Sequence, residues 1–119
     1  MSDFKGTLDG KGLLIGMVHL RALPGTPRHE LPIDEIERIA VHEAMTLADA
    51  GFDALLIENM HDLPYLNRQV GPEIVSAMTR ISTVIRSAVE CPVGIQVLAG
   101  ANQAALAIAH CCQLDFIRA

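Results

Sequence analysis

Gly51-Phe-Asp-Ala-Leu-Leu-Ile-Glu-Asn-Met-His-Asp-Leu-Pro-Tyr65 is the stretch of sequence from which the fold can be argued. It opens with a glycine suited to the left-handed end of a helix and continues as a short apolar run. The run stops abruptly at a group of polar residues, Glu58, Asn59, His61 and Asp62. A continuous apolar run of this kind is typical of a buried parallel strand that presents functional side chains at its carboxyl end.

Strands and helices alternate along the rest of the chain. The other apolar runs predict strands over 13–20, 93–98 and 114–118, in addition to the strand that ends at Glu58. Helical spacing of apolar residues predicts helices over 33–50, from Pro72 to the residues before Pro92, and over 103–113, with Asn102 as the N-cap of the last. Alternation of this kind implies right-handed crossovers and a parallel sheet.

Two folds compete for this pattern, a doubly wound sheet and a (β/α)8 barrel. The segment after the first strand, Val18-His19-Leu20-Arg21, contains no glycine-rich phosphate-binding fingerprint, which weakens the nucleotide-binding doubly wound sheet. Polar residues at the carboxyl end of every strand favour the barrel, because barrel active sites lie there. An eight-stranded barrel takes about 250 residues, whereas this chain has 119.

We therefore expect the N-terminal half of a TIM-like (β/α)8 barrel, truncated after its fourth strand. Residues 13–119 would form this partial domain, with four parallel strands and three helices, after a flexible lead-in over residues 1–12. Four strands alone would leave open sheet edges and an uncovered inner face. Whether such a chain folds alone or as a homo-oligomer is left open.

Composition narrows the class of protein. Half of the residues are hydrophobic, which suits helices packed on parallel strands, and the net charge of −5 excludes a basic surface for nucleic acid. The first residues resemble neither a secretory signal nor a mitochondrial presequence. Residues 91–114 carry no full charge, but prolines, glycines and amides divide them into a strand, a turn and a helix, so we predict no transmembrane segment. We interpret the three cysteines as reduced, and expect a soluble intracellular protein, most simply cytoplasmic.

Four polar residues occupy equivalent positions in the predicted strands. Because alternate residues of a strand share a face, one face can bring together His19, Glu58, Gln96 and Arg118 at one rim of the sheet. These groups could perform acid–base chemistry or hold an anionic substrate. The structural alternative is an ion pair between Glu58 and Arg118 beside a core histidine. We favour the site, because buried strands rarely carry charged residues without a purpose.

A metal site is a weaker interpretation. His19, Glu58, His61 and Asp62 are residue types that bind divalent cations, but no recognised ligand spacing such as His-Glu-x-x-His is present. We therefore assign no metal ligand, and the sequence identifies no cofactor.

Several ordered motifs give the chain a resemblance to the BtpA family. The matching segments are Ile15-Gly-Met-Val-His-Leu-Arg-Ala-Leu-Pro-Gly-Thr-Pro27, Ala48-Asp-Ala-Gly-Phe-Asp-Ala-Leu-Leu-Ile-Glu-Asn-Met-His-Asp62, Val70-Gly-Pro-Glu73, Pro92-Val-Gly-Ile-Gln-Val-Leu98 and Asp115-Phe-Ile-Arg118. The resemblance implies a TIM-barrel-like fold and a link to the biogenesis or stability of photosystem I, with undefined chemistry. SgcQ-type members of the family accompany sugar metabolism.

The resemblance places the candidate site residues within family motifs. It implies Glu58, His19 and Arg118 as catalytic candidates and Asn59, Asp62 and Gln96 as substrate-binding candidates. His61 stands where many members have glycine, and Gln96 where asparagine is common. The segment Leu98-Ala-Gly-Ala-Asn102 replaces a more polar turn of the family, which puts substrate contacts in that loop in doubt.

Three functions follow from this interpretation. The first is the family's role in photosystem I biogenesis, in a shortened chain that is inactive alone. The second is an enzyme acting on a small sugar-like or phosphorylated molecule, and the third is a shortened isoform with only an interaction role. The residues do not decide whether the protein is an enzyme.

Overall fold

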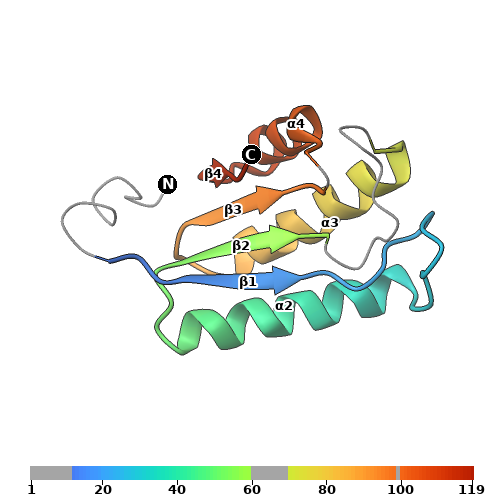
Figure 1. Ribbon diagram of the computed structural model, residues 1–119. Helices are drawn as coiled ribbons and strands as arrows, with labels where there is room; N and C mark the ends of the chain where they lie inside the picture. Colours follow the sequence, from blue (N-terminus) through green and yellow to red (C-terminus); the bar gives the residue numbers. More distant parts are fainter. Residues whose placement is uncertain (1–11, 60–69, 99) are drawn as a thin grey trace.

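Four parallel strands form one sheet in this protein (Figure 1). The structure is a computed structural model that describes residues 12–59, 70–98 and 100–119. The strands are β1 (Ile15–His19), β2 (Ala54–Glu58), β3 (Val93–Gln96) and β4 (Phe116–Ile117), and the helices are α2 (Ile33–Asp49), α3 (Pro72–Ala88) and α4 (Asn102–Cys112). The predicted α/β architecture with four parallel strands and three helices is confirmed.

The strands lie in the order in which they occur in the chain, β1-β2-β3-β4. Helix α2 contacts α3, and α3 contacts α4, so the three helices form one layer on one face of the sheet (Figure 1). A doubly wound sheet reverses its strand order and carries helices on both faces. Over the described residues this sheet does neither.

The core lies between the sheet and the helix layer. One side of β1, β2 and β3 supplies fully buried aliphatic residues, including Val18, Leu55, Ile57 and Ile95. They pack with buried residues of the three helices, among them Ile36, Ile81 and Ile108. The apolar runs of β2 and β3 are nearly continuous because almost every position in these two strands is buried. The face turned away from the helices carries the alternate residues.

Several ends of the elements differ from the predictions, and β4 covers only Phe116–Ile117 of the predicted 114–118. Asn102 is the first residue of α4 and not its N-cap, and Ala101 occupies the cap without a side-chain hydrogen bond. The prediction was wrong because the carbonyl oxygen of Ala101 already accepts the helical hydrogen bond from the amide of Ala105. Strand β3 ends at Gln96, two residues earlier than predicted, because the amide of Leu98 donates to the Asn59 side chain.

The structure agrees with the predictions for the cysteines and for the uncharged stretch 91–114. Cys91, Cys111 and Cys112 are free thiols, and burial raises the pKa of Cys91 and of Cys112. Residues 91–114 divide into β3, a turn and α4, as predicted. Of the helices in the described parts of the chain, none has the length and apolar character needed to cross a membrane.

Candidate functional site at the carboxyl ends of the strands

The register of the sheet places three of the predicted site residues in one row. His19 of β1 pairs with Glu58 of β2, which in turn pairs with Gln96 of β3. Neighbouring strands are about 4.8 Å apart, so each backbone position in the row is one strand spacing from the next. All three alternate with the buried residues that face the helices. Their side chains therefore belong to the open face of the sheet, at its carboxyl edge.

Arg118 continues this row at the end of β4. Ile95 pairs with Ile117, so the next residue of each strand brings Arg118 beside Gln96. The amide of Arg118 donates to the carbonyl oxygen of Ile95 at 3.0 Å, which extends the strand register by one residue. The side chain of Arg118 is exposed.

The carboxylate of Glu58 lies in an unusual environment. Glu58 is only 4% exposed, although it is a carboxylic acid on the face of the sheet turned away from the helices. The predicted alternative was an ion pair with Arg118, but these two described residues form none. In residues 12–59, 70–98 and 100–119 no donor to the Glu58 carboxylate is found. An acid with so little exposed surface is uncommon inside a protein, so its presence calls for a functional explanation.

His19 joins the row to a groove at the free edge of β1. Its Nε2 atom is buried and has no hydrogen-bond partner within the described part of the chain. The groove has a volume of about 470 Å³, and His19 and Arg21 line it together with residues of α2 that include His42 and Glu43. An unpaired buried ring nitrogen is ready to exchange a proton or a hydrogen bond with a ligand.

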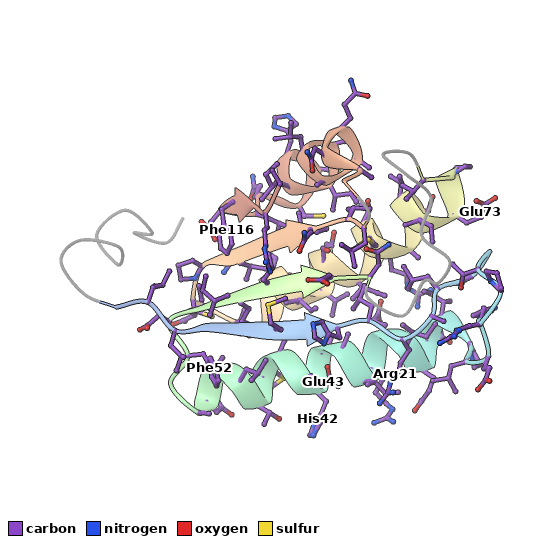
Figure 2. All side chains as sticks on the ribbon, in the orientation of Figure 1. Arg21, His42, Glu43, Phe52, Glu73 and Phe116 are labelled. Atoms are coloured by element: carbon purple, nitrogen blue, oxygen red, sulfur yellow. The ribbon has the colours of Figure 1, made fainter. Side chains whose placement is uncertain are left out.

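Phe116 forms the floor beneath Gln96 and Arg118. A Cβ atom at Gly94 would lie 2.3–2.5 Å from three carbon atoms of the Phe116 ring, so the ring lies directly on the glycine. Gly94 of β3 pairs with Phe116 of β4, and Phe116 is labelled in Figure 2. Because glycine has no side chain, the Phe116 ring can cover this part of the sheet, two residues before the polar row along each strand.

Asn59 follows Glu58 but has a different role in the fold. Its Oδ1 accepts a hydrogen bond from the Leu98 amide at 2.7 Å, and its Nδ2 donates to the Leu98 carbonyl oxygen at 3.4 Å. Asn59 is 1% exposed, so these bonds are formed in the protein interior. The carboxamide thus holds the segment after β3 against the end of β2. Asp62 and His61, the other polar residues of this segment, lie outside the described residues.

No group of three or more histidine, cysteine, aspartate or glutamate side chains suited to a metal ion occurs within the described ranges. Two members of the metal hypothesis, His61 and Asp62, fall outside those ranges.

A buried ion pair at the opposite edge of the sheet was not predicted. Arg86 Nη1 donates to Asp115 Oδ2 at 2.7 Å, and the same oxygen accepts the Val93 amide at 2.9 Å. Arg86 Nη2 also donates to the carbonyl oxygens of Val89 and Cys91, at 3.1 and 2.8 Å. The sequence contains one signal, since Asp115 immediately precedes a strand, but its partner lies 29 residues earlier in a helix. This cluster lies at the amino ends of the strands. Residues at that end of a barrel serve stability rather than catalysis, so we interpret the ion pair as structural.

Comparisons with known proteins identify relatives over nearly the whole chain. The model of the BtpA family matches residues 11–119. An uncharacterised mitochondrial protein of Caenorhabditis elegans is 42% identical over 112 residues, which cover 90% of this chain and 40% of the nematode protein. An uncharacterised protein of Pyrococcus horikoshii is 41% identical over 88% of this chain and 40% of its own length.

A third relative carries a functional name. The photosystem I biogenesis protein BtpA of Synechocystis is 41% identical over 116 residues, which cover 98% of this chain and 40% of that protein. This chain therefore spans about 40% of the length of these relatives. No solved structure matches it significantly.

Proposed function

This chain belongs to the BtpA family, and we propose that it forms the first half of a (β/α)8 barrel whose carboxyl-end rim binds and transforms a small polar molecule. Consecutive parallel strands with all helices on one face support the half-barrel, because this is the winding from which such barrels are built. The length of the relatives supports it too, since about 60% of each lies outside the matched region and is long enough to supply further strands.

One observation carries the functional proposal. It is the row of His19, Glu58, Gln96 and Arg118, in which a 4% exposed carboxylate has no partner among the described residues. A protein that needed only stability would fill this position with an apolar residue, as it does at Leu56 in the same strand. Barrel enzymes place their catalytic groups at this edge of the sheet.

Each member of the row has a role that follows from its chemistry. Glu58 and His19 are the candidates for proton transfer, because they are the titratable groups of the row and lie on adjacent strands. Gln96 offers a donor and an acceptor to a polar substituent, and Arg118 offers a fixed positive charge. Asn59 orders the segment after β3, and Asp62 remains a substrate-binding candidate. We expect this chain alone to bind ligand without turning it over, because further strands would complete the rim.

Participation in photosystem I biogenesis is the second candidate function. It is favoured by the name of the Synechocystis relative, which is 41% identical over 98% of this chain. The same degree of identity extends to an animal and an archaeon. A property common to all three relatives therefore does not depend on photosynthesis, and a small-molecule site satisfies that condition better than an assembly role. An interaction-only isoform would require no unpartnered acid at the rim.

Ligand binding tests the proposed site. A panel of free sugars and sugar phosphates would be screened against the 119-residue protein by NMR, beside the variants Glu58→Gln and His19→Asn. We expect at least one compound to shift the amide signals of residues 19, 58 and 96, with binding weakened at least about tenfold in either variant because each loses a charge-assisted or buried hydrogen bond.

Glu90→Gln is the matched control, since it removes an exposed acid near the amino ends of the strands, away from the row and from the groove beside His19. Binding that persists unchanged in both row variants, or a panel that gives no binding at all, would overturn the proposal.

A further inference from the structure

The arginines of this protein fall into two groups. Six lie in the described residues, and three of these have carboxylate partners: Arg38 pairs with Glu35, Arg80 with Asp34 and Glu37, and Arg86 with Asp115. The other three, Arg21, Arg28 and Arg118, have no acidic partner within the described residues. All three unpaired arginines follow the carboxyl end of a strand, whereas the three paired ones lie on helices.

This distribution is not what net charge alone would produce. The chain has five more acidic than basic residues, so carboxylates are available to pair with every guanidinium group. Unpaired cations gathered at the edge of the sheet that carries the proposed site indicate a negatively charged ligand. This inference rests on the proposed function and names the charge of the molecule that the site takes.

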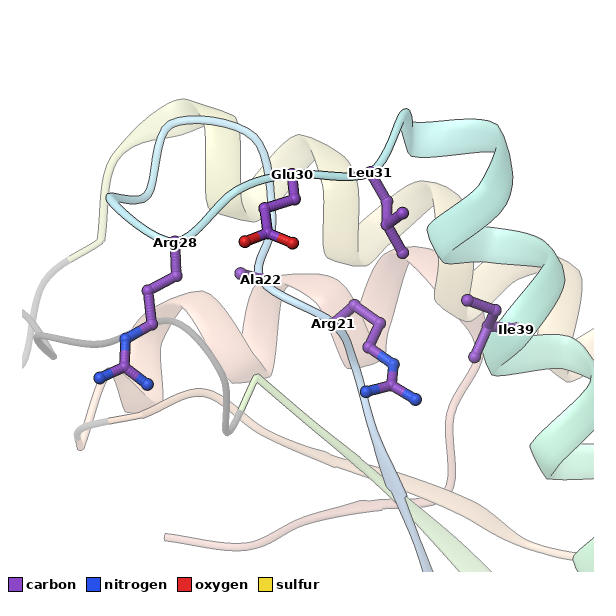
Figure 3. A pocket seen from close by; sticks show the side chains of 6 residues that line it. All are labelled: Arg21, Ala22, Arg28, Glu30, Leu31 and Ile39. Atoms are coloured by element: carbon purple, nitrogen blue, oxygen red, sulfur yellow. The ribbon is translucent and has the colours of Figure 1, made fainter.

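Arg21 and Arg28 line one pocket in the loop between β1 and α2. The pocket has a volume of about 410 Å³ and is also lined by Ala22, Glu30, Leu31 and Ile39. Figure 3 shows the two arginine side chains extending to the same side of the loop, with the Glu30 carboxylate between their attachment points. Apolar side chains of Leu31 and Ile39 form the wall towards α2.

The loop that carries these arginines is firmly held. Leu23 is fully buried in the core, and its carbonyl oxygen accepts hydrogen bonds from Thr26 Oγ1 at 2.7 Å and from the Thr26 amide at 3.2 Å. Gly25 has a φ of 92°, and a Cβ atom there would lie 3.1 Å from Cβ of Glu73, so the loop rests against the start of α3. A loop fixed at these points holds both arginines near the pocket before a ligand arrives.

Arg21 connects this pocket with the polar row. It also lines the neighbouring groove at the edge of β1, together with His19. A molecule with its reactive end at His19 and Glu58 could therefore place a charged end in the loop pocket.

We propose that Arg21 and Arg28 form a subsite that binds the phosphate group of a small phosphorylated ligand. Two guanidinium groups match a dianion with three acceptor oxygens better than a carboxylate, which carries one charge. The negative charge of Glu30, which lines the same pocket, weakens the binding of an anion. Neutralising Glu30 should therefore raise the affinity for phosphate.

Titration of the 119-residue protein with inorganic phosphate tests this subsite. The amide signals of Ala22 and Leu31 would be followed by NMR at constant ionic strength, with sodium acetate and sodium chloride as comparison salts. We expect phosphate to shift these signals more than acetate does, and Arg21→Gln or Arg28→Gln to weaken phosphate binding by about tenfold each. Glu30→Gln is expected to tighten phosphate binding several-fold, because it removes a negative charge that repels the phosphate.

Arg38→Gln is the matched control, because it removes the same charge from the exposed face of α2. Equal shifts from phosphate and chloride, or an equal loss in the Arg38 variant, would overturn the subsite. Binding of uncharged sugars at the row would survive that outcome, so failure of the subsite is distinguishable from failure of the proposed function.

Discussion

Replacing Asp115 with alanine is expected to lower the free energy of unfolding by about 3–5 kcal/mol. The Asp115 side chain is 3% exposed, and its Oδ2 atom accepts from both Arg86 Nη1 and the Val93 amide. Removing the Asp115 carboxylate would take this acceptor away from two groups at once, the Arg86 guanidinium and the buried Val93 amide. Three elements would lose their common anchor, namely the end of α3 and the starts of β3 and β4.

Urea unfolding followed by circular dichroism measures this effect. Asp115→Asn should lie between the wild type and Asp115→Ala, since its amide oxygen can still accept from Val93 but carries no charge. Arg80→Gln is the surface control, because Arg80 bridges Asp34 and Glu37 in solvent, and we expect a much smaller loss from it. An Asp115→Ala variant as stable as the Arg80 variant would show that the buried pair does not hold the strands.

Replacing Ile57 with alanine is expected to destabilise the protein by about 2–5 kcal/mol. Ile57 has no exposed surface and lies in β2, the strand between β1 and β3, where it packs within the core under the helices. Alanine would remove three carbon atoms and leave a cavity that the surrounding aliphatic residues cannot close completely.

The same unfolding experiment checks this prediction. Ile15→Ala is a matched control, because Ile15 is 37% exposed at the start of β1, and its loss should be below about 1 kcal/mol. A similar loss at both positions would mean that the sheet is not packed against the helices as described.

The strands and the polar row could be predicted because both depend on local pattern. Apolar runs located β2 and β3, and the alternation of side chains placed His19, Glu58 and Gln96 on one face before their register was known. The parallel register follows because each of these residues ends its strand in successive strand–helix units. The polar residues at the strand ends also favoured a barrel, in which the strands lie in chain order.

Long-range pairing and loop geometry could not be predicted. Nothing in the pattern of α3 distinguishes Arg86, whose partner lies 29 residues away, from Arg80, which pairs in solvent. The Asn59 carboxamide looked available for a ligand, yet it spans 39 residues of sequence to bind the backbone of Leu98. Arg21 and Arg28 share a pocket because of the turn between them, which combines local hydrogen bonds of Thr26 to Leu23 with the close approach of Gly25 to α3.

The stability of the Glu58→Gln variant tests most directly whether the polar row is a functional site. Glutamine has almost the same shape as glutamate but no charge, so it removes the desolvation penalty of a 4% exposed carboxylate while keeping its packing. If Glu58 is retained for function, urea unfolding should show a free energy of unfolding equal to that of the wild type or higher, by up to about 2 kcal/mol. A decrease of about 3 kcal/mol or more would show that Glu58 holds the fold together as one member of a buried charge pair, and it would contradict the proposed site.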